Sequence, residues 1–391
     1  MVKKHKFHED LEKFKIEIFQ TLKPISPVSE KTRADKDFLF SAQKTEESKS
    51  LPEYYLCYFL FIDLLGFRNL GQFEKVSWSI PIDYLGEAYL LEHRKFGFGL
   101  FAKDKEAQQA DAKVIVKLIQ KAIEFSKPYF EWRAKICADN SELNVLNYNY
   151  NLFHRFQYHL DEYNKVNSEA IERKDERIIK VLNDNAKTIS IPSIELKRNA
   201  NWLALSAIDA FFTWTEHVFI HAAILQCKIN TGKEVADLAE GNWGDKFKTA
   251  LDISNPDINK YYNQLVLIKR QIRNYVAHGA FGKRGEAFLI HTGAGAVPLL
   301  MPHQQGNSRF SFKRDLEFQE SEALSVINNF INYYWESEIF PEVIYIKSEL
   351  PTILTMTKDG TYQKAMISVE EMNCFIEHLS EMHNQAVNMD W

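Results

Sequence analysis

Apolar residues recur with helical spacing over much of the first half of this chain. The spacing predicts helices over residues 8–23 and 111–136, and Pro128 is expected to kink or break the second of them. Residues 53–71 between them are apolar, and a buried helix is expected over 54–67. Residues 76–101 are interrupted by a proline and by glycines, and we expect short strands or irregular pieces there.

The second half of the chain contains the longest helical patterns. Residues 151–185 are strongly charged, as is typical of a solvated helix or a coiled-coil arm, and the pattern stops near residues 188–192. Residues 201–227 are mostly apolar and predict a buried helix, and a helix over 257–278 begins after a proline and ends before a glycine. Further helices are expected over 316–338 and 369–387. β-Hairpins are expected over 286–301 with 309–313 and around Lys358, Asp359 and Gly360.

These patterns predict a mainly α protein with small β-hairpin insertions. We expect a mostly helical N-terminal domain over 1–190 and a helical bundle over 191–340. A C-terminal β-hairpin plus helix over 341–391 is expected to pack on the bundle. The N-terminal domain is expected to sense a signal, to regulate, or to bind a partner protein or ligand.

Composition narrows the class of protein without changing this picture. The chain has 391 residues, of which 45% are hydrophobic, and only 15 Gly and 11 Pro, which favours helices over a loop-rich or all-β fold. Its four cysteines form no CxxC pair, so neither a zinc ribbon nor a disulfide framework is expected. The longest apolar run, residues 54–67, is too short to cross a membrane and contains Asp63. We therefore expect a cytoplasmic protein with no membrane partner.

The helix expected over 257–278 has two chemically distinct faces. On a helical wheel, one face is apolar and suits a core; it consists of Tyr261, Leu265, Ile268, Ile272, Tyr275 and Val276. The other face gathers Arg270, Arg273, Asn274 and His278. Asn274 and His278 are four residues apart and can interact directly, whereas Arg273 and His278 lie at opposite edges of the polar stripe. A complete site is therefore expected to need a second copy of the chain.

Positive charge is concentrated around this helix. The stretch from Ile258 to Gly285 contains six basic residues and no Asp or Glu, although the whole chain has a net charge of −5. The six are Lys260, Lys269, Arg270, Arg273, Lys283 and Arg284. This local excess predicts a phosphate-binding surface for an RNA substrate, with substrate-binding roles for Lys269, Arg270, Lys283 and Arg284.

These residue types suit RNA cleavage by attack of the ribose 2′-OH. Because histidine titrates near neutral pH, His278 can move protons as a general base or acid. Arg273 keeps its charge and can hold the phosphate while negative charge builds up in the transition state. Asn274 can orient the imidazole or hold the phosphate. The scheme requires neither a metal ion nor a cofactor.

The segment RNYVAH over 273–278, followed by Gly279, resembles the R-x4-6-H motif of HEPN-domain ribonucleases. The segment SAIDAFFTWTEHVF over 206–219 is similar to the first helix of such domains, so the resemblance covers roughly residues 198–338. It implies a HEPN-like helical bundle and a homodimer in which two motif helices build one composite, metal-independent ribonuclease site. Many members of this family act as toxins, abortive-infection proteins or CRISPR-linked effectors.

The same residue types allow other interpretations. Arg284 and His291 also satisfy the motif, but they lie across an expected loop and strand rather than at a helix end. Arg273 and His278 could also serve only to cap a helix, since both residue types favour the last turn.

The helix over 201–227 carries one polar stripe, which consists of Ser206, Asp209, Thr213, Glu216 and His217. Either Glu216 or Asp209 supports the site by anchoring Arg273 or lining the cleft, or the stripe faces solvent. His217 and His221 have a spacing that can hold a metal ion, but no third ligand is evident and no metal site is expected.

Two functions follow from these residues and the resemblance. The first is a metal-independent endoribonuclease that acts as an effector of antiviral defence or stress. The second is a non-catalytic HEPN module that uses the same basic face to bind RNA or nucleotide as a scaffold.

Overall fold

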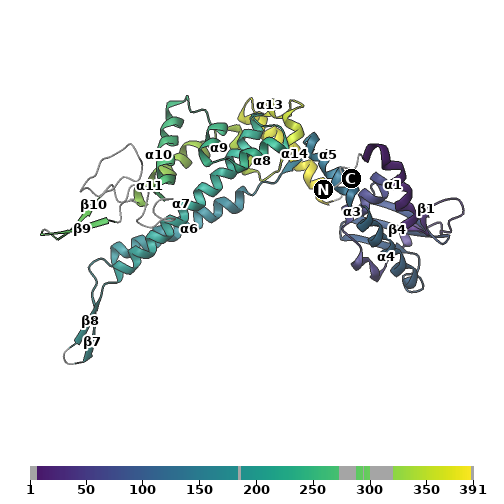
Figure 1. Ribbon diagram of the computed structural model, residues 1–391, viewed down its shortest axis with the longest axis horizontal. Helices are drawn as coiled ribbons and strands as arrows, with labels where there is room; N and C mark the ends of the chain where they lie inside the picture. Colours follow the sequence, from purple (N-terminus) through teal and green to yellow (C-terminus); the bar gives the residue numbers. More distant parts are fainter. Residues whose placement is uncertain (1–6, 184–185, 273–287, 294, 300–319, 389–391) are drawn as a thin grey trace. The chain divides into compact units, whose positions relative to one another are not determined.

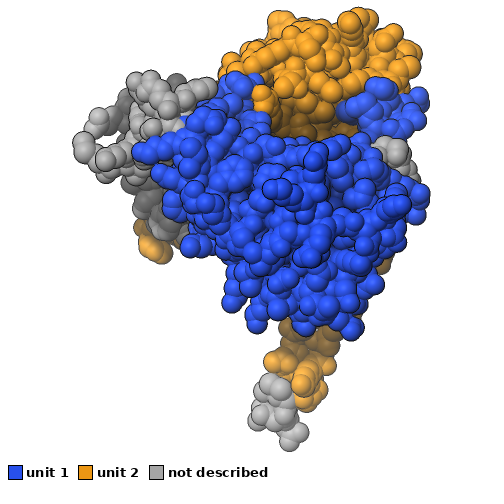
Figure 2. Space-filling view, turned by 90° about the vertical axis from the view of Figure 1, so that its right-hand side faces the viewer, with its two compact units in different colours: residues 1–140, 377–391 blue, residues 141–376 orange. Residues whose placement is uncertain are grey.

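The computed structural model describes residues 7–183, 186–272, 288–293, 295–299 and 320–388. The chain divides into two compact units, residues 1–140 with 377–391 and residues 141–376, which are coloured separately in Figure 2. Helices predominate in the described ranges, and small antiparallel sheets accompany them (Figure 1). The mainly α class expected from the sequence is therefore confirmed.

The first unit is built around a five-stranded antiparallel sheet with the strand order β1-β3-β4-β5-β2. The central meander consists of β3 (Val76–Tyr84), β4 (Glu87–Arg94) and β5 (Gly97–Ala102). Two short strands, β1 (Ile25–Pro27) and β2 (Gln43–Lys44), pair at its edges. Leu85 and Gly86, with φ values of 54° and 85°, make the tight turn between β3 and β4.

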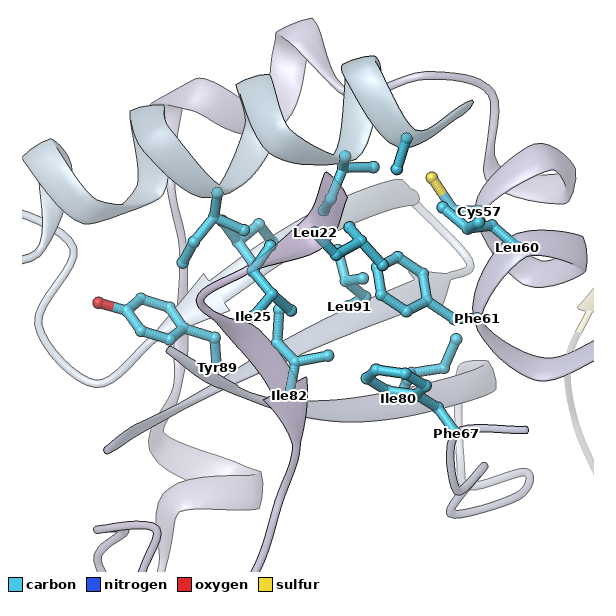
Figure 3. Packing of buried hydrophobic residues seen from close by; sticks show 14 of the residues in the cluster. Leu22, Ile25, Cys57, Leu60, Phe61, Phe67, Ile80, Ile82, Tyr89 and Leu91 are labelled. Carbon is cyan, nitrogen blue, oxygen red and sulfur yellow. The ribbon is translucent and has the colours of Figure 1, made fainter. Parts of the chain in front are cut away.

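Helices cover one face of this sheet and form its main core. They are α1 (Phe7–Leu22), α3 (Tyr54–Tyr58), the π-helix η2 (Phe59–Leu64) and α4 (Gln109–Phe125). Figure 3 shows Leu22 and Phe61 from the helices packed against Ile82 and Leu91 from the sheet, and all four side chains are fully buried. Burial of this apolar face contributes most of the stability of the unit.

Smaller elements complete the first unit. The short helix α2 (Phe38–Ser41) covers the opposite face of the sheet, where Phe38 packs in a small cluster with Leu90 and Phe101. η1 (Glu46–Ser50) follows β2, and α5 (Lys127–Asn140) follows α4 after a break at Ser126. This break lies close to Pro128, where the sequence predicted it.

The second unit is a helical assembly centred on two long helices. α6 (Asn149–Glu172) and α7 (Pro192–Leu225) lie side by side along their lengths and are joined by a hairpin of β7 (Ile178–Asn183) and β8 (Ala186–Ser190) (Figure 1). Packed with α7 are α8 (Gly232–Glu240), α9 (Trp243–Ala250) and α11 (Glu320–Phe330), while α10 (Pro256–Ile272) contacts α9 and α11. The π-helix η4 (Ile331–Trp335) continues α11.

The remaining elements are short, apart from the last helix. They are β6 (Asn144–Val145), β9 (Phe288–Thr292), β10 (Gly295–Leu299), α12 (Pro341–Lys347), β11 (Thr352–Ile353), η5 (Leu354–Thr357), α13 (Thr361–Ala365) and α14 (Val369–Asn388). β9 and β10 form the hairpin expected over 286–301.

An aromatic core holds the second unit together. Trp214 is 1% exposed, and its indole N–H donates to Asn149 Oδ1 on α6 at 2.8 Å. Its ring contacts Phe153 and Trp335, with centroids at 4.7 and 5.0 Å. A buried indole needs both packing and a hydrogen-bond partner, and Asn149 supplies the partner across the helix pair.

The chain divides into its two compact units between Asn140 and Ser141, whereas the sequence predicted a domain boundary near residue 190. The charged segment 151–185 was interpreted as a solvated helix or a coiled-coil arm, and α6 packs along α7, which agrees with the second interpretation. The helix also ends at Glu172, because the β-branched residues of 178–190 with a polar turn favour a hairpin.

The expected N-terminal domain also differs in kind from the first unit. Of the two alternatives for residues 76–101, short strands or irregular pieces, the strands are confirmed, and they form the centre of a sheet in a domain that was expected to be mostly helical. At the other end, residues 341–376 belong with the second unit and 377–391 with the first.

The hairpin expected around Lys358, Asp359 and Gly360 is wrong. Gly360, with φ at 88°, instead starts α13, and the preceding residues form η5. The short strand β11 pairs with β6, so its hydrogen bonds go to a distant part of the chain. Within the described ranges, none of the helices combines the length and apolar character that crossing a membrane requires.

Candidate functional site

The polar stripe of α7 separates into a solvated part and a half-buried part. Asp209 is exposed, and its carboxylate lies 3.8 Å from the guanidinium of Arg155 on α6. Thr213 bonds back to the carbonyl of Asp209 in the same solvated part. Glu216, about two turns further along α7, is 33% exposed and faces α9 and α10. Only the second part of the stripe therefore reaches α10, whose last residue, Ile272, directly precedes the candidate motif in the sequence.

Glu216 lies between two lysines from different helices. Lys246 on α9 donates to Glu216 Oε2 at 2.6 Å, and Lys269 on α10 donates to Glu216 Oε1 at 2.8 Å. The side chain of Lys246 is 5% exposed and that of Lys269 is 39% exposed. We call Glu216, Lys246 and Lys269 the lysine–carboxylate cluster. It ties three helices together through one carboxylate.

The cluster keeps its carboxylate charged. Burial by itself would raise the pKa of Glu216, but hydrogen bonds and charge from Lys246 and Lys269 outweigh it, so the pKa lies below its ordinary value. Two lysines against one carboxylate leave a net charge of +1. The positive excess lies on the more exposed side, since Lys246 is buried and Lys269 is not.

Aromatic rings fix the position of Lys269. Its ammonium lies 5.1 Å from the ring centroid of Phe212 and 5.7 Å from that of Trp243. The indole N–H of Trp243 in turn donates to Thr215 Oγ1 on α7 at 2.9 Å. A lysine held by a carboxylate and two ring faces loses less conformational freedom on binding a phosphate than a free surface lysine does.

The last turn of the described part of α10 is basic. Lys269 and Arg270 occupy it, and Arg270 is exposed. The predicted catalytic residues Arg273, Asn274 and His278 follow directly in the sequence and lie outside the described residues, as do Lys283 and Arg284. The structure therefore brings Glu216 together with Lys269, and it places Asp209 away from them.

Lys246 was not among the site residues predicted from the sequence. The residue lies on the same face of α9 as Trp243, Phe247 and Ala250, all of which are buried. A lysine at helical spacing within an apolar face has to find a counter-charge, since burial of an unpaired ammonium is costly. The spacing of Lys246 within this apolar face could have indicated a buried ion pair, and Glu216 on the polar stripe of α7 was the carboxylate available to form it.

The two histidines considered as metal ligands lie within the fold and bond to protein groups. Their ring centroids are 4.4 Å apart. His217 Nε2 accepts a hydrogen bond from the backbone N–H of Tyr148, and His221 Nδ1 lies 2.9 Å from Thr352 Oγ1. Burial lowers the pKa of His217 to about 4, and burial with the neighbouring His217 lowers that of His221 to about 3. Both rings are therefore neutral near pH 7.

Comparison of the chain with protein-family models, with curated proteins and with solved structures found no match.

Proposed function

We propose that this protein is a cytoplasmic, metal-independent endoribonuclease of the HEPN type. It acts as a homodimer and serves as an effector of antiviral defence or as a toxin. The observation that best supports this proposal is the lysine–carboxylate cluster, which binds the basic end of α10 to α7 and α9. Arg273 begins the candidate motif four residues after Lys269 in the sequence.

The chemistry follows from the residue types. His278 removes the proton of the ribose 2′-OH, the oxygen attacks the adjacent phosphorus, and the bond to the 5′ oxygen breaks. The products are a 2′,3′-cyclic phosphate and a free 5′-OH, and the leaving oxygen takes up a proton. Arg273 compensates the charge that builds up on the phosphate oxygens, and Asn274 orients the imidazole.

Substrate binding relies on the positive charge beside the motif. Lys269 and Arg270 attract the RNA backbone, and Lys283 with Arg284 extends the same charge along the sequence. Glu216 supports the site by holding Lys269 in place rather than by touching RNA. The first unit has a regulatory or sensing role in this proposal.

The decisive experiment is an RNA cleavage assay in the presence of a chelator. Wild type is expected to cut RNA, His278→Ala to lose about 10²–10⁴-fold in rate, and Arg273→Ala about 10²–10³-fold. His291→Ala is the matched control, because His291 pairs with Arg284 in the second occurrence of the motif and lies exposed on β9. Its rate should equal that of wild type.

The results separate the two functions. If wild type binds RNA but leaves it intact, the protein is the non-catalytic RNA- or nucleotide-binding scaffold instead. Cleavage that persists in both motif variants would place the active site elsewhere. Mixing Arg273→Ala with His278→Ala protomers should restore part of the activity, since a composite site then receives one intact copy of each residue.

A further inference from the structure

The first unit contains a pocket of about 600 Å³ that plays no part in the proposed ribonuclease site. It lies between α3, the start of η2, the segment 69–72 and the start of β3. Its lining consists of Tyr54, Tyr55, Tyr58, Phe59, Asn69, Gly71, Gln72, Ser77 and Trp78. The volume falls in the range typical of sites for small organic ligands.

Aromatic rings dominate the walls of this pocket. Tyr54 and Tyr55 are 42% and 47% exposed, and their rings meet edge to face at 5.5 Å. Tyr54 also stacks flat on His93, with centroids 4.1 Å apart and planes at 4°. Tyr58 packs against the buried Trp78, with ring centroids 5.5 Å apart. These contacts hold the rings in place, while close to half of Tyr54 and of Tyr55 stays exposed and available to a ligand.

Besides the tyrosine hydroxyls, the polar side chains of the pocket are two amides and the hydroxyl of Ser77. Asn69 Oδ1 accepts from the backbone N–H groups of Gly71 and Ser79 at 3.0 and 3.3 Å. Both bonds use the amide oxygen, and within the described ranges no residue accepts from the amide nitrogen. Gln72 is exposed and Ser77 half-buried. Such groups match the donor and acceptor edge of a heterocyclic base.

The backbone beside the pocket is unusual. Phe59 begins the π-helix η2, in which the N–H of Leu65 bonds to the carbonyl of Leu60, five residues earlier, at 3.1 Å. π-helical turns are rare and occur frequently at functional sites. Here the wider turn follows Tyr58 directly, at the point where the helix lines the pocket.

The charge of the lining residues helps to decide which class of ligand an aromatic pocket binds. None of the lining residues carries a formal charge at neutral pH. A phosphate would find no lysine or arginine in the lining, and a quaternary ammonium would use the ring faces but not the amides. A planar, neutral heterocycle uses both, because it stacks on the tyrosines and pairs its edge with Asn69 or Gln72.

We infer that this pocket binds a nucleobase, from a free nucleoside or nucleotide or from a single-stranded nucleic acid. The base stacks on Tyr54 or Tyr55, and the amide groups contact its edge. The sugar and any phosphate extend toward solvent. This inference does not depend on ribonuclease activity in the second unit.

The test is a calorimetric titration of the full chain with the four ribonucleosides, their 5′-monophosphates, choline and a six-nucleotide RNA. The RNA titrations use the Arg273→Ala background so that the strand is not cut. At least one nucleoside, or the RNA strand, is expected to bind, and Tyr55→Ala should weaken that binding roughly 5- to 150-fold. The matched control is Tyr158→Ala, which removes a tyrosine that is 63% exposed on α6.

Because Tyr55 is about half exposed, its removal should leave thermal stability unchanged, and a melting curve checks that the variant is folded. Tyr55-dependent binding of nucleosides assigns a free ligand, whereas Tyr55-dependent binding of RNA alone assigns a base within a strand. The inference is overturned if choline binds in place of every base, if nothing binds, or if Tyr55→Ala binds as tightly as wild type.

Discussion

The lysine–carboxylate cluster should contribute a measurable amount to the free energy of unfolding. Glu216→Gln keeps the size and one acceptor of the side chain but removes its charge. Lys246, whose side chain is 5% exposed, then keeps a buried ammonium with no ionised partner in the cluster. Lys269 is 39% exposed and can be solvated by water, so its loss of a partner costs little.

The size of the effect follows from these exposures. Removing one partner of a fully buried ion pair costs about 3–5 kcal/mol. Because Glu216 is one-third exposed, water compensates part of that cost, and we expect about 3 kcal/mol for Glu216→Gln. Asp209→Asn is the matched control on the same helix. Its partner Arg155 lies 3.8 Å away in solvent, so it should cost less than about 0.5 kcal/mol.

Urea unfolding followed by tryptophan fluorescence measures both changes, because Trp214 and Trp243 lie in the core of the second unit. A double-mutant cycle with Lys246→Met isolates the pair. Since methionine removes the buried charge and keeps an apolar side chain, the double variant should be more stable than Glu216→Gln by about 2 kcal/mol. Additive losses in the cycle, or equal losses for Glu216→Gln and Asp209→Asn, would refute the reasoning.

Three further predictions follow. The pKa values of His217 and His221 in the folded protein lie below the ordinary value of histidine, so the unfolded chain takes up protons first as the pH falls. The free energy of unfolding should therefore decrease as the pH drops from about 6.5 toward 4. Thermal melts across this range test the prediction, and a melting temperature that stays constant between about pH 7 and 5 would contradict it. Lys269→Gln should weaken RNA binding about equally for all sequences. It should also reduce the slope of the logarithm of the RNA association constant against the logarithm of the salt concentration by about 0.7, as measured by fluorescence anisotropy. An unchanged slope would mean that Lys269 does not contact phosphate. Thr231→Ala should lower the free energy of unfolding by about 1 kcal/mol, because Thr231 and Glu234 form a capping box at the start of α8. Urea unfolding of this variant measures the change, and an unchanged free energy of unfolding would show that the cap does not stabilise the protein.

Local sequence patterns predicted most of the helices, because the residues that start, continue and end a helix lie close together in the sequence. The helix starting near residue 8 ends at Leu22, before Pro24, and the break near Pro128 appears at Ser126. The hairpin over 288–299 was also predictable, from its alternation and glycines. In each case, the residues that decide the structure lie within a few positions of one another.

Features that depend on distant contacts were not predictable in the same way. The charged sequence of α6 allowed either a solvated helix or a coiled-coil arm, and only the packing on α7, with Phe156 and Tyr163 buried, distinguishes the two. The strand β11 pairs with β6, about 200 residues earlier in the chain, so the local hairpin signal at Gly360 gave the wrong partner. A pattern of polar and apolar residues identifies a buried face but does not identify what covers it.

In the candidate site too, residue spacing predicted which side chains share a helix face, but only packing shows which of them meet other helices. The polar stripe of α7 placed Asp209 and Glu216 on one face, and spacing alone did not distinguish them. Packing does, because α9 and α10 cover the stripe at Glu216 and leave Asp209 in solvent. The carboxylate that reaches α10 is fully engaged by Lys246 and Lys269, so it acts by positioning a cation rather than by moving a proton. A supporting role of this kind predicts that Glu216→Gln impairs RNA binding through Lys269 without shifting the pH optimum of cleavage, which His278 would set.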